Sequence, residues 1–479
     1  LFSTARKYIH PNIAATAATV LSLVAVPAVM AYQNWDDHDR SQKYSAEFIA
    51  DAYLESVAEN KDAMIFTIGD NDTFLLWYAQ EIEGYRTDVR VINTSLLQTD
   101  WYIDQMKRQA YQSTPIPGQL VHKQYAHGVR EAIYYQKRTD NRWNIKDFVN
   151  WITSDDPSTR SSRGAGEYKQ DFYYYPTNKL RIPVNKENVL KSGIVKPEDA
   201  DKIVDYIDIT LPGAIDKARI VMLDILANND WKRPIYFTGG SMDSAEYLWM
   251  KDYLQLDGLV YKLVPIKTPI DKNNPYDMGR IDSELMYNIV KRWTWGNMGK
   301  EGIYLDPETR KNSIIFRGNL ARLTEQLIAE GKTAKASEII DIAMKNMPVD
   351  AYGYYFTLDP FIEGSYKVGK KEQARAIALQ VIKKYQEELN YYTHLPAGEL
   401  NSKRIQYCID RYGEVVMLSE TLDKEFYTAQ WAIFKDKAGL FMGEKELEEY
   451  FKGAASQAAL DSLRNTLIDT TATSDSTEE

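Results

Sequence analysis

The chain has 479 residues, of which 44% are hydrophobic, so it is long enough to form two or three folded domains. Its 58 Lys and Arg against 68 Asp and Glu give a net charge of −10, and this balance argues against a nucleic-acid partner. Cys408 is the only cysteine and the five histidines are scattered, which excludes an intrachain disulfide and argues against a metal site. We therefore expect no metal or cofactor in this chain.

The first predicted element is an uncharged apolar stretch, Asn12 to Tyr32, which is long enough as a helix to cross a bilayer. Arg6 and Lys7 precede it and aspartates follow it, so the positive-inside rule places the rest of the chain outside the cytoplasm. A cleaved signal peptide is the alternative, because Val29-Met30-Ala31 has the small-residue pattern of a cleavage site. We favour a retained helix within residues 1–33. Since the first residue is Leu, we also expect the sequence to begin inside a longer reading frame.

Residues 34–278 are expected to form an extracytoplasmic α/β domain, which begins with a helix over Tyr44 to Val57. Its clearest unit is a strand over Met64 to Ile68, a helix that ends near Gly84, and a strand over Val89 to Ile92. This order predicts a parallel βαβ crossover with a central first strand. The residues expected to form the buried stripe of the helix are Phe74, Leu75, Trp77, Tyr78 and Ile82.

The loop at the tip of this unit carries Asp70, Asn71 and Asp72, at the carboxyl end of the predicted strand. In open α/β sheets ligands bind at that end. The simpler interpretation is an ordinary turn, in which Asp72 or Thr73 caps the helix. The carboxylates would otherwise hold a cation or accept hydrogen bonds from sugar hydroxyls, although the spacing lacks the later Gly and Glu of a calcium loop. The sequence leaves both interpretations open.

The rest of this domain is predicted from shorter patterns. A helix is expected over Asp100 to Tyr111 with Thr99 as its cap, and residues 118–181 are expected to form an irregular, mobile loop. The further predicted elements are strands over Leu180–Val184, Tyr206–Leu211, Pro234–Thr238 and Leu259–Pro265, and a helix over Ala214–Ala227.

The segment Asn228 to Gly240 resembles the first unit, because a polar turn, a short strand and a glycine pair follow a helix. Arg233 in this segment is a candidate partner for a carboxylate of the first loop or for a phosphate. An ordinary tight turn explains the glycine pair equally well. The full set of candidate ligand-binding residues is Asp70, Asn71, Asp72, Trp77, Asp100, Trp101, Trp231 and Arg233.

Residues 279–468 show helical periodicity without strand patterns. Two helical pairs are predicted, over Ser313–Pro348 and Pro360–Leu389, with turns at Gly331 and Gly369. The equal spacing of these turns indicates a tetratricopeptide-like repeat region, although any array of helical hairpins can imitate this rhythm. Residues 469–479 are Thr, Ser, Ala and acidic residues and are expected to be a disordered tail.

Three phrases carry a resemblance to a known family: NWDDHDRSQKY, IFTIGDNDTFLLWYAQEIEGYRTDVRVINTSLLQTDWYIDQM and LDILANNDWKRPIYFTGG. They resemble the C-terminal soluble portion of bacterial membrane proteins of the protein O-mannosyltransferase-like family. The resemblance covers Asn34 to Gly240. It implies a multi-spanning glycosyltransferase of the GT-C type that uses a lipid-linked sugar donor and acts outside the cytoplasm. The catalytic carboxylate of such enzymes lies in an early loop between membrane helices, which is not represented here, so no catalytic role is assigned to Asp70 or Asp72.

We therefore expect the extracytoplasmic part of a glycosyltransferase-like protein of the bacterial inner membrane, with its soluble part in the periplasm and a protein or glycan acceptor as its partner. The alternative is a secreted or membrane-anchored adaptor that binds peptides or glycans through helical repeats. A stand-alone α/β hydrolase is disfavoured, because the sequence has no Gly-x-Ser-x-Gly elbow.

Overall fold

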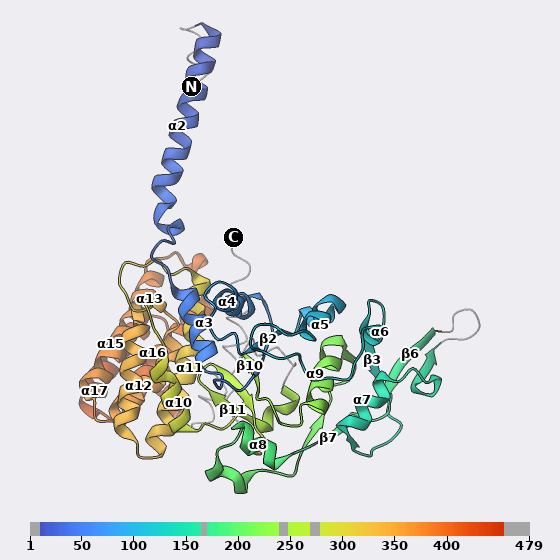
Figure 1. Cartoon of the computed structure of the whole chain (residues 1–479). Helices are drawn as coiled ribbons and strands as arrows, with labels where there is room; N and C mark the ends of the chain where they lie inside the picture. Colours follow the sequence, from blue (N-terminus) through green and yellow to red (C-terminus); the bar gives the residue numbers. More distant parts are fainter. Residues whose placement is uncertain (1–9, 164–169, 239–247, 269–277, 455–479) are drawn as a thin grey trace.

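The computed structural model describes residues 10–163, 170–238, 248–268 and 278–454. A long helix, α2 (Pro11–His38), stands apart from a body with sheets in the N-terminal half and helices in the C-terminal half of the chain (Figure 1). Within α2, Ala15–Trp35 is long and apolar enough to cross a membrane, and none of it is buried in the body. The predicted disordered tail lies outside the described residues.

The body is built around a five-stranded sheet of strand order β11-β12-β10-β1-β2. Its strands are β1 (Met64–Thr67), β2 (Arg90–Asn93), β10 (Ile235–Thr238), β11 (Leu254–Asp257) and β12 (Val260–Leu263). The predicted central position of β1 is confirmed, because it pairs in parallel with both β10 and β2. All residues of these five strands are buried, including polar residues of β2, β11 and β12 such as Arg90, Gln255 and Lys262.

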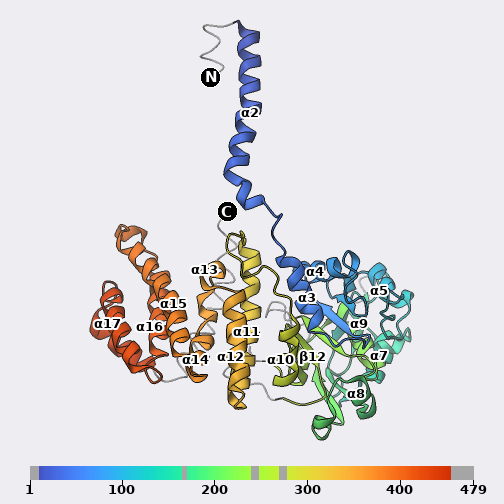
Figure 2. The ribbon, with the colours of Figure 1, turned by 60° about the vertical axis from the view of Figure 1, so that its left-hand side comes forward.

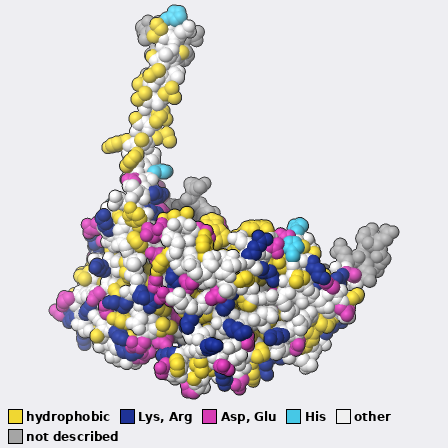
Figure 3. Space-filling model, viewed as in Figure 1, with side chains coloured by type: hydrophobic (Ala, Val, Ile, Leu, Met, Phe, Trp, Pro, Cys, Tyr) yellow, Lys and Arg dark blue, Asp and Glu magenta, His cyan; other side chains and the backbone are white. Residues whose placement is uncertain are grey.

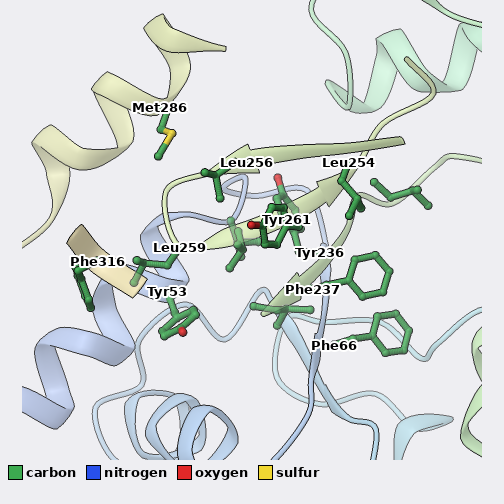
Figure 4. Packing of buried hydrophobic residues seen from close by; sticks show 14 of the residues in the cluster. Tyr53, Phe66, Tyr236, Phe237, Leu254, Leu256, Leu259, Tyr261, Met286 and Phe316 are labelled. Atoms are coloured by element: carbon green, nitrogen blue, oxygen red, sulfur yellow. The ribbon is translucent and has the colours of Figure 1, made fainter. Parts of the chain in front are cut away.

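Aromatic side chains fill the core around this sheet. Phe66 of β1 and Phe237 of β10 stack with their ring centroids 5.5 Å apart (Figure 4). Tyr53 comes from helix α3 (Ser45–Glu55), and its ring faces the same core. The antiparallel strands β11 and β12 extend the sheet on the β10 side, and β11 was not predicted.

Helix α4 (Asp70–Glu81) connects β1 to β2 and packs against α3. Its predicted buried stripe is confirmed only for Leu75 and Trp77, which are half-buried against the core. The residues that face the sheet are Thr73, Leu76, Ala79 and Gln80, whereas Phe74, Tyr78 and Ile82 are 54%, 42% and 70% exposed. The polar members of the buried face are tolerated because they are paired: Gln80 Nε2 donates to the carbonyl oxygens of Arg86 and Val89, both at 2.8 Å.

Residues 118–181 form ordered elements where the structure describes them, so the predicted mobile loop is wrong there. Two small sheets, β5-β6-β3-β9 and β4-β7-β8, lie beside the main sheet. The elements of this lobe and its surroundings are α5 (Asp100–Met106), α6 (His122–Tyr125), β3 (Ala132–Tyr135), β4 (Trp143–Asn144), α7 (Ile145–Thr153), β5 (Arg160–Arg163), β6 (Gln170–Tyr175), β7 (Lys179–Pro183), α8 (Lys186–Ser192), β8 (Tyr206–Thr210), β9 (Ile215–Asp216) and α9 (Lys217–Asn228).

The C-terminal half is helical, as predicted. Its helices are α10 (Ser283–Arg292), α11 (Pro307–Ala329), α12 (Thr333–Asn346), α13 (Val349–Tyr352), α14 (Asp359–Lys367), α15 (Lys371–Thr393), α16 (Ser402–Met417), α17 (Lys424–Ala438) and α18 (Glu444–Ala454). Consecutive helices pack as hairpins, α11 on α12 and α14 on α15 (Figure 2). The two predicted turns are at Gly331 and Gly369, whose positive φ angles of 74° and 82° suit glycine.

The two halves share one hydrophobic core. Asn319 Nδ2 on α11 donates to the carbonyl oxygen of Gly258 in the β11–β12 turn at 2.9 Å, and Arg322 Nη2 donates to that of Gly279 at 3.0 Å. Gly258 has φ +61°, and a Cβ there would lie 2.3 Å from Ser56 Oγ and 2.9 Å from Trp293. The helices therefore pack directly on the turn of the sheet.

Candidate functional site

Asp72, the last of the three polar residues of the predicted loop, holds the end of the sheet together. It lies in the first turn of α4, where its Oδ1 accepts a hydrogen bond from the Gly69 N–H and its Oδ2 one from the Ile68 N–H, both at 3.2 Å. Oδ2 also accepts a hydrogen bond from the hydroxyl of Thr238, at the end of β10. The N-cap position belongs to Gly69, so Asp72 supports the helix from inside its first turn.

A buried polar network continues from this point across the carboxyl ends of the parallel strands. The hydroxyls of Thr67 and Thr73 are 2.6 Å apart, and Asn93 Nδ2 donates to Thr73 Oγ1 at 2.9 Å. Thr67, Thr73, Asn93 and Thr238 are all buried. Because these groups satisfy one another, the network accounts for its polar residues without a ligand.

Asp70 and Asn71 stand at the same edge, but they are exposed. Their side chains form no hydrogen bond within the described part of the chain. Asp70 is therefore the carboxylate of this loop that remains available to solvent. The ligand-binding role of the loop stays a prediction.

Three other candidates lie on the helices that follow the parallel strands. Asp100 is the first residue of α5, and its Oδ2 accepts a hydrogen bond from the His127 N–H at 3.1 Å. That bond is the main cause of the lowered pKa of Asp100, so its carboxylate serves to fix the neighbouring loop. Trp101 is 55% exposed, whereas Trp77 is half-buried on α4 beside Phe74, with ring centroids 5.7 Å apart.

Trp231 and Arg233 do not join these residues, and the predicted approach of Arg233 to the first loop is wrong. They precede β10, at the amino end of the parallel strands. Arg233 Nη2 pairs with Asp62 at 3.0 Å, and its Nη1 donates to the Pro115 carbonyl oxygen at 2.8 Å. Trp231 is buried and donates from Nε1 to the Pro183 carbonyl oxygen at 2.8 Å. Both residues therefore join loops at the opposite end of the sheet.

The structure reveals a cleft that the sequence reasoning missed, between α7 and the turn that follows it. Its volume is about 470 Å³. The residues that line it are Trp143, Asp147, Asn150, Trp151, Ser154, Asp156, Ser158 and Thr159. The signal in the sequence was the helical spacing of Asp147, Asn150, Trp151 and Ser154, which places them on one face of α7 and its C-cap, whereas Trp143 comes from β4.

The two indole rings of the cleft are held in fixed positions. Their centroids are 5.5 Å apart with an interplanar angle of 70°, and Trp151 Nε1 donates to the Tyr174 carbonyl oxygen at 2.8 Å. An aromatic face carries negative partial charge, so it attracts the weakly positive C–H groups of a sugar ring. The rings form an apolar wall that is already in place before a ligand arrives.

Polar groups on the other positions of the cleft supply hydrogen bonds. Asn150 Oδ1 accepts a hydrogen bond from Gln119 Nε2 at 2.8 Å. The NH₂ group of Asn150 can therefore donate a hydrogen bond to a ligand in the cleft. Asp147 is exposed and forms no hydrogen bond or ion pair within the described residues. The backbone N–H of Ser158 donates to Asp156 and lowers the pKa of that carboxyl, so Asp156 is ionised at neutral pH. The cleft thus combines aromatic faces with an amide donor, three hydroxyls and two carboxylates.

No group of three or more His, Cys, Asp or Glu suited to a metal ion occurs among the residues that the structure describes. Together, the sheets, the helical hairpins and the exposed apolar helix define a two-part α/β and all-α protein with one candidate membrane span. Residues 46–285, which are 240 of the 479 residues, match the family model described as TMEM260-associated domain 2, and the chain belongs to this family. No curated protein and no solved structure matches the chain.

Proposed function

We propose that this chain is the extracytoplasmic region of a glycosyltransferase-related membrane protein and that it binds the glycan or glycan-bearing acceptor. Three features support the proposal: the TMEM260-associated family, the apolar helix α2, and the resemblance to O-mannosyltransferase-like proteins. In this proposal α2 lies in the bacterial inner membrane and the body lies in the periplasm. Transfer from a lipid-linked donor would be the work of a GT-C membrane region, and none of the described residues is assigned to that step.

The observation that carries the binding role is the cleft with Trp143 and Trp151. Ligand sites combine fixed apolar walls with a few polar groups that set the orientation of the ligand, and this cleft has both. The self-contained network around Asp72 has no comparable free polar groups. The cleft is open, and its only charged lining residues are the carboxylates of Asp147 and Asp156. The many hydroxyl groups of a neutral saccharide can donate hydrogen bonds to these carboxylates, so such a ligand suits the cleft best.

The test is calorimetric titration of the chain in detergent with neutral hexose oligosaccharides. Asp147→Asn should weaken binding about tenfold or more, since a hydrogen bond to a charged group contributes about 1.5–3 kcal/mol. Trp143→Ala should also weaken binding through loss of the aromatic face. Tyr391→Ala is the control, because it removes an exposed aromatic ring outside the cleft. Equal affinities for the parent chain and both cleft variants would refute the proposal.

The adaptor alternative differs in what the gene encodes before Leu1. Further apolar spans in the same reading frame would support a multi-spanning glycosyltransferase-like protein. A start codon followed by a signal sequence would support a secreted or membrane-anchored adaptor.

A further inference from the structure

An apolar stripe along α4 and its C-cap is largely exposed to solvent in the described structure. It consists of Phe74, Tyr78 and Ile82, which are spaced four residues apart and lie on the side of α4 opposite its buried face. Their exposed fractions of 54%, 42% and 70% are high for a helix that connects two buried strands. An exposed row of large apolar side chains of this kind marks a binding surface.

The stripe lies on the same side of the body as the candidate membrane span. In two views related by a turn about the vertical, α4 and α5 occupy the end of the body from which α2 leaves (Figures 1 and 2). Hydrophobic side chains gather along this upper edge near the base of α2 (Figure 3). Trp101 on α5 is also exposed.

The connection between α2 and the body is too short and too firmly held to move this face far from a membrane. Only residues 39–44 separate α2 from α3, a length of about 20 Å when fully extended. Lys43 forms an ion pair with Asp306, and Asn297 Nδ2 donates to the Gln42 carbonyl oxygen at 2.5 Å. These contacts fix the connector to the body.

The chemistry of the stripe suits the boundary between lipid headgroups and acyl chains. Tyr78 presents an aromatic ring while its hydroxyl donates to Glu83 at 2.7 Å, so one side chain offers both an apolar part and a hydrated part. Tyr32 and Trp35 near the end of α2 give that helix the aromatic residues typical of the same boundary. The nearby Glu81 and Glu83 disfavour anionic headgroups, so contact must depend on apolar area.

From this placement we infer that Phe74, Tyr78 and Ile82 dip into the interface of the bilayer that holds α2 and so orient the body against the membrane. The inference rests on the proposed membrane insertion of α2. It assigns lipid as the occupant of the stripe, and it gives the exposed aromatic residues of α4 a role that burial in a protein core does not provide.

Spin labels on single cysteines test this in nanodiscs of phosphatidylcholine. Cys408 can remain, because burial raises the pKa of its thiol and keeps it unreactive. The label positions are Ile82→Cys in the stripe, Val24→Cys in α2, and Lys191→Cys on α8, at the far end of the body in both ribbon views. The readout is the accessibility of each label to oxygen, which concentrates in lipid, relative to a water-soluble nickel complex.

We expect the oxygen-to-nickel ratio at positions 24 and 82 to be several-fold higher than at position 191. A high ratio at 24 with an aqueous value at 82 would overturn the membrane contact of the stripe and leave the anchor intact. An aqueous value at 24 would overturn the anchor and the inference together.

Discussion

A buried ion pair joins two helical hairpins, and removing one charge should loosen both. Asp359 at the start of α14 accepts a hydrogen bond from Arg411 of α16 at 2.6 Å, and both side chains are only 4% exposed. Arg411 also pairs with Glu414. Two unit charges about 4 Å apart interact by about 4 kcal/mol at an effective dielectric constant near 20, and breaking a buried pair from one side costs about 3–5 kcal/mol. Because Glu414 keeps Arg411 partly neutralised, we expect Asp359→Asn to cost about 3 kcal/mol.

Hydrogen exchange followed by mass spectrometry measures this cost locally, as faster exchange of the protected amides of α14 and α16. The matched control is Glu363→Gln on the same helix, which removes an exposed pair with Lys367 at 2.7 Å and should cost less than about 0.5 kcal/mol. Arg411→Met in the Asp359→Asn background should add to the loss, because it also removes the ion-pair partner of Glu414, whose side chain is only 10% exposed. Equal exchange in Asp359→Asn and the control would refute the reasoning.

Three further predictions concern the sheet domain and the anchor. Burial, reinforced by the charges of Glu47, Glu55 and Glu83, raises the pKa of Asp51 to about 6. The ionised carboxylate therefore destabilises the fold above that pH, and this destabilisation is relieved as the pH falls toward 4. Asp51→Asn should therefore raise stability near pH 7 by about 1 kcal/mol or less after solvent screening, with no gain near pH 4 in parallel melts; a gain that persists at low pH would contradict this. Asp72→Asn should lower the free energy of unfolding by about 1–2 kcal/mol, because an amide cannot accept all the hydrogen bonds that the carboxylate accepts. Asp70→Asn is the control and should leave the melting temperature unchanged. Equal melting temperatures for the two variants would show that the contacts of Asp72 contribute nothing to stability. A reporter enzyme that works only after export, fused after Glu479, should be active, and activity of a cytoplasmic reporter at that position would contradict the proposed topology.

Outside residues 118–181, the order of most elements was predictable because strands and helices differ in length and in apolar pattern. The βαβ unit around β1 and the helical hairpins with turns at Gly331 and Gly369 follow from those local signals. The buried face of α4 did not follow from them. This helix is apolar on two sides, and only the position of the sheet decides that Leu76 turns inward while Phe74 turns outward.

The candidate site depended even more on contacts between distant segments. Arg233 and Asp72 lie at opposite ends of parallel strands, and a sequence similarity between the two segments could not reveal this. The cleft at Trp143 was missed because residues 118–181 lack long periodic runs, so their short strands were interpreted as a loop. Strands of this length are stabilised by partners that come from far along the chain, such as the pairing of β3 with β9.

The firmly held connector between α2 and the body changes how motion would travel through the molecule. Lys43 contacts Asp306, and Asp306 also caps α11 by accepting a hydrogen bond from the Thr309 N–H at 2.9 Å. A flexible linker would change its own conformation when α2 tilts and would transmit little of the tilt to the body. Here the tilt would act as a torque on the first turn of α11, and through the contact of α11 with Gly258 it would reach the sheet. A change in bilayer thickness or in the packing of neighbouring membrane helices that tilts α2 would therefore rotate the whole body as one rigid unit.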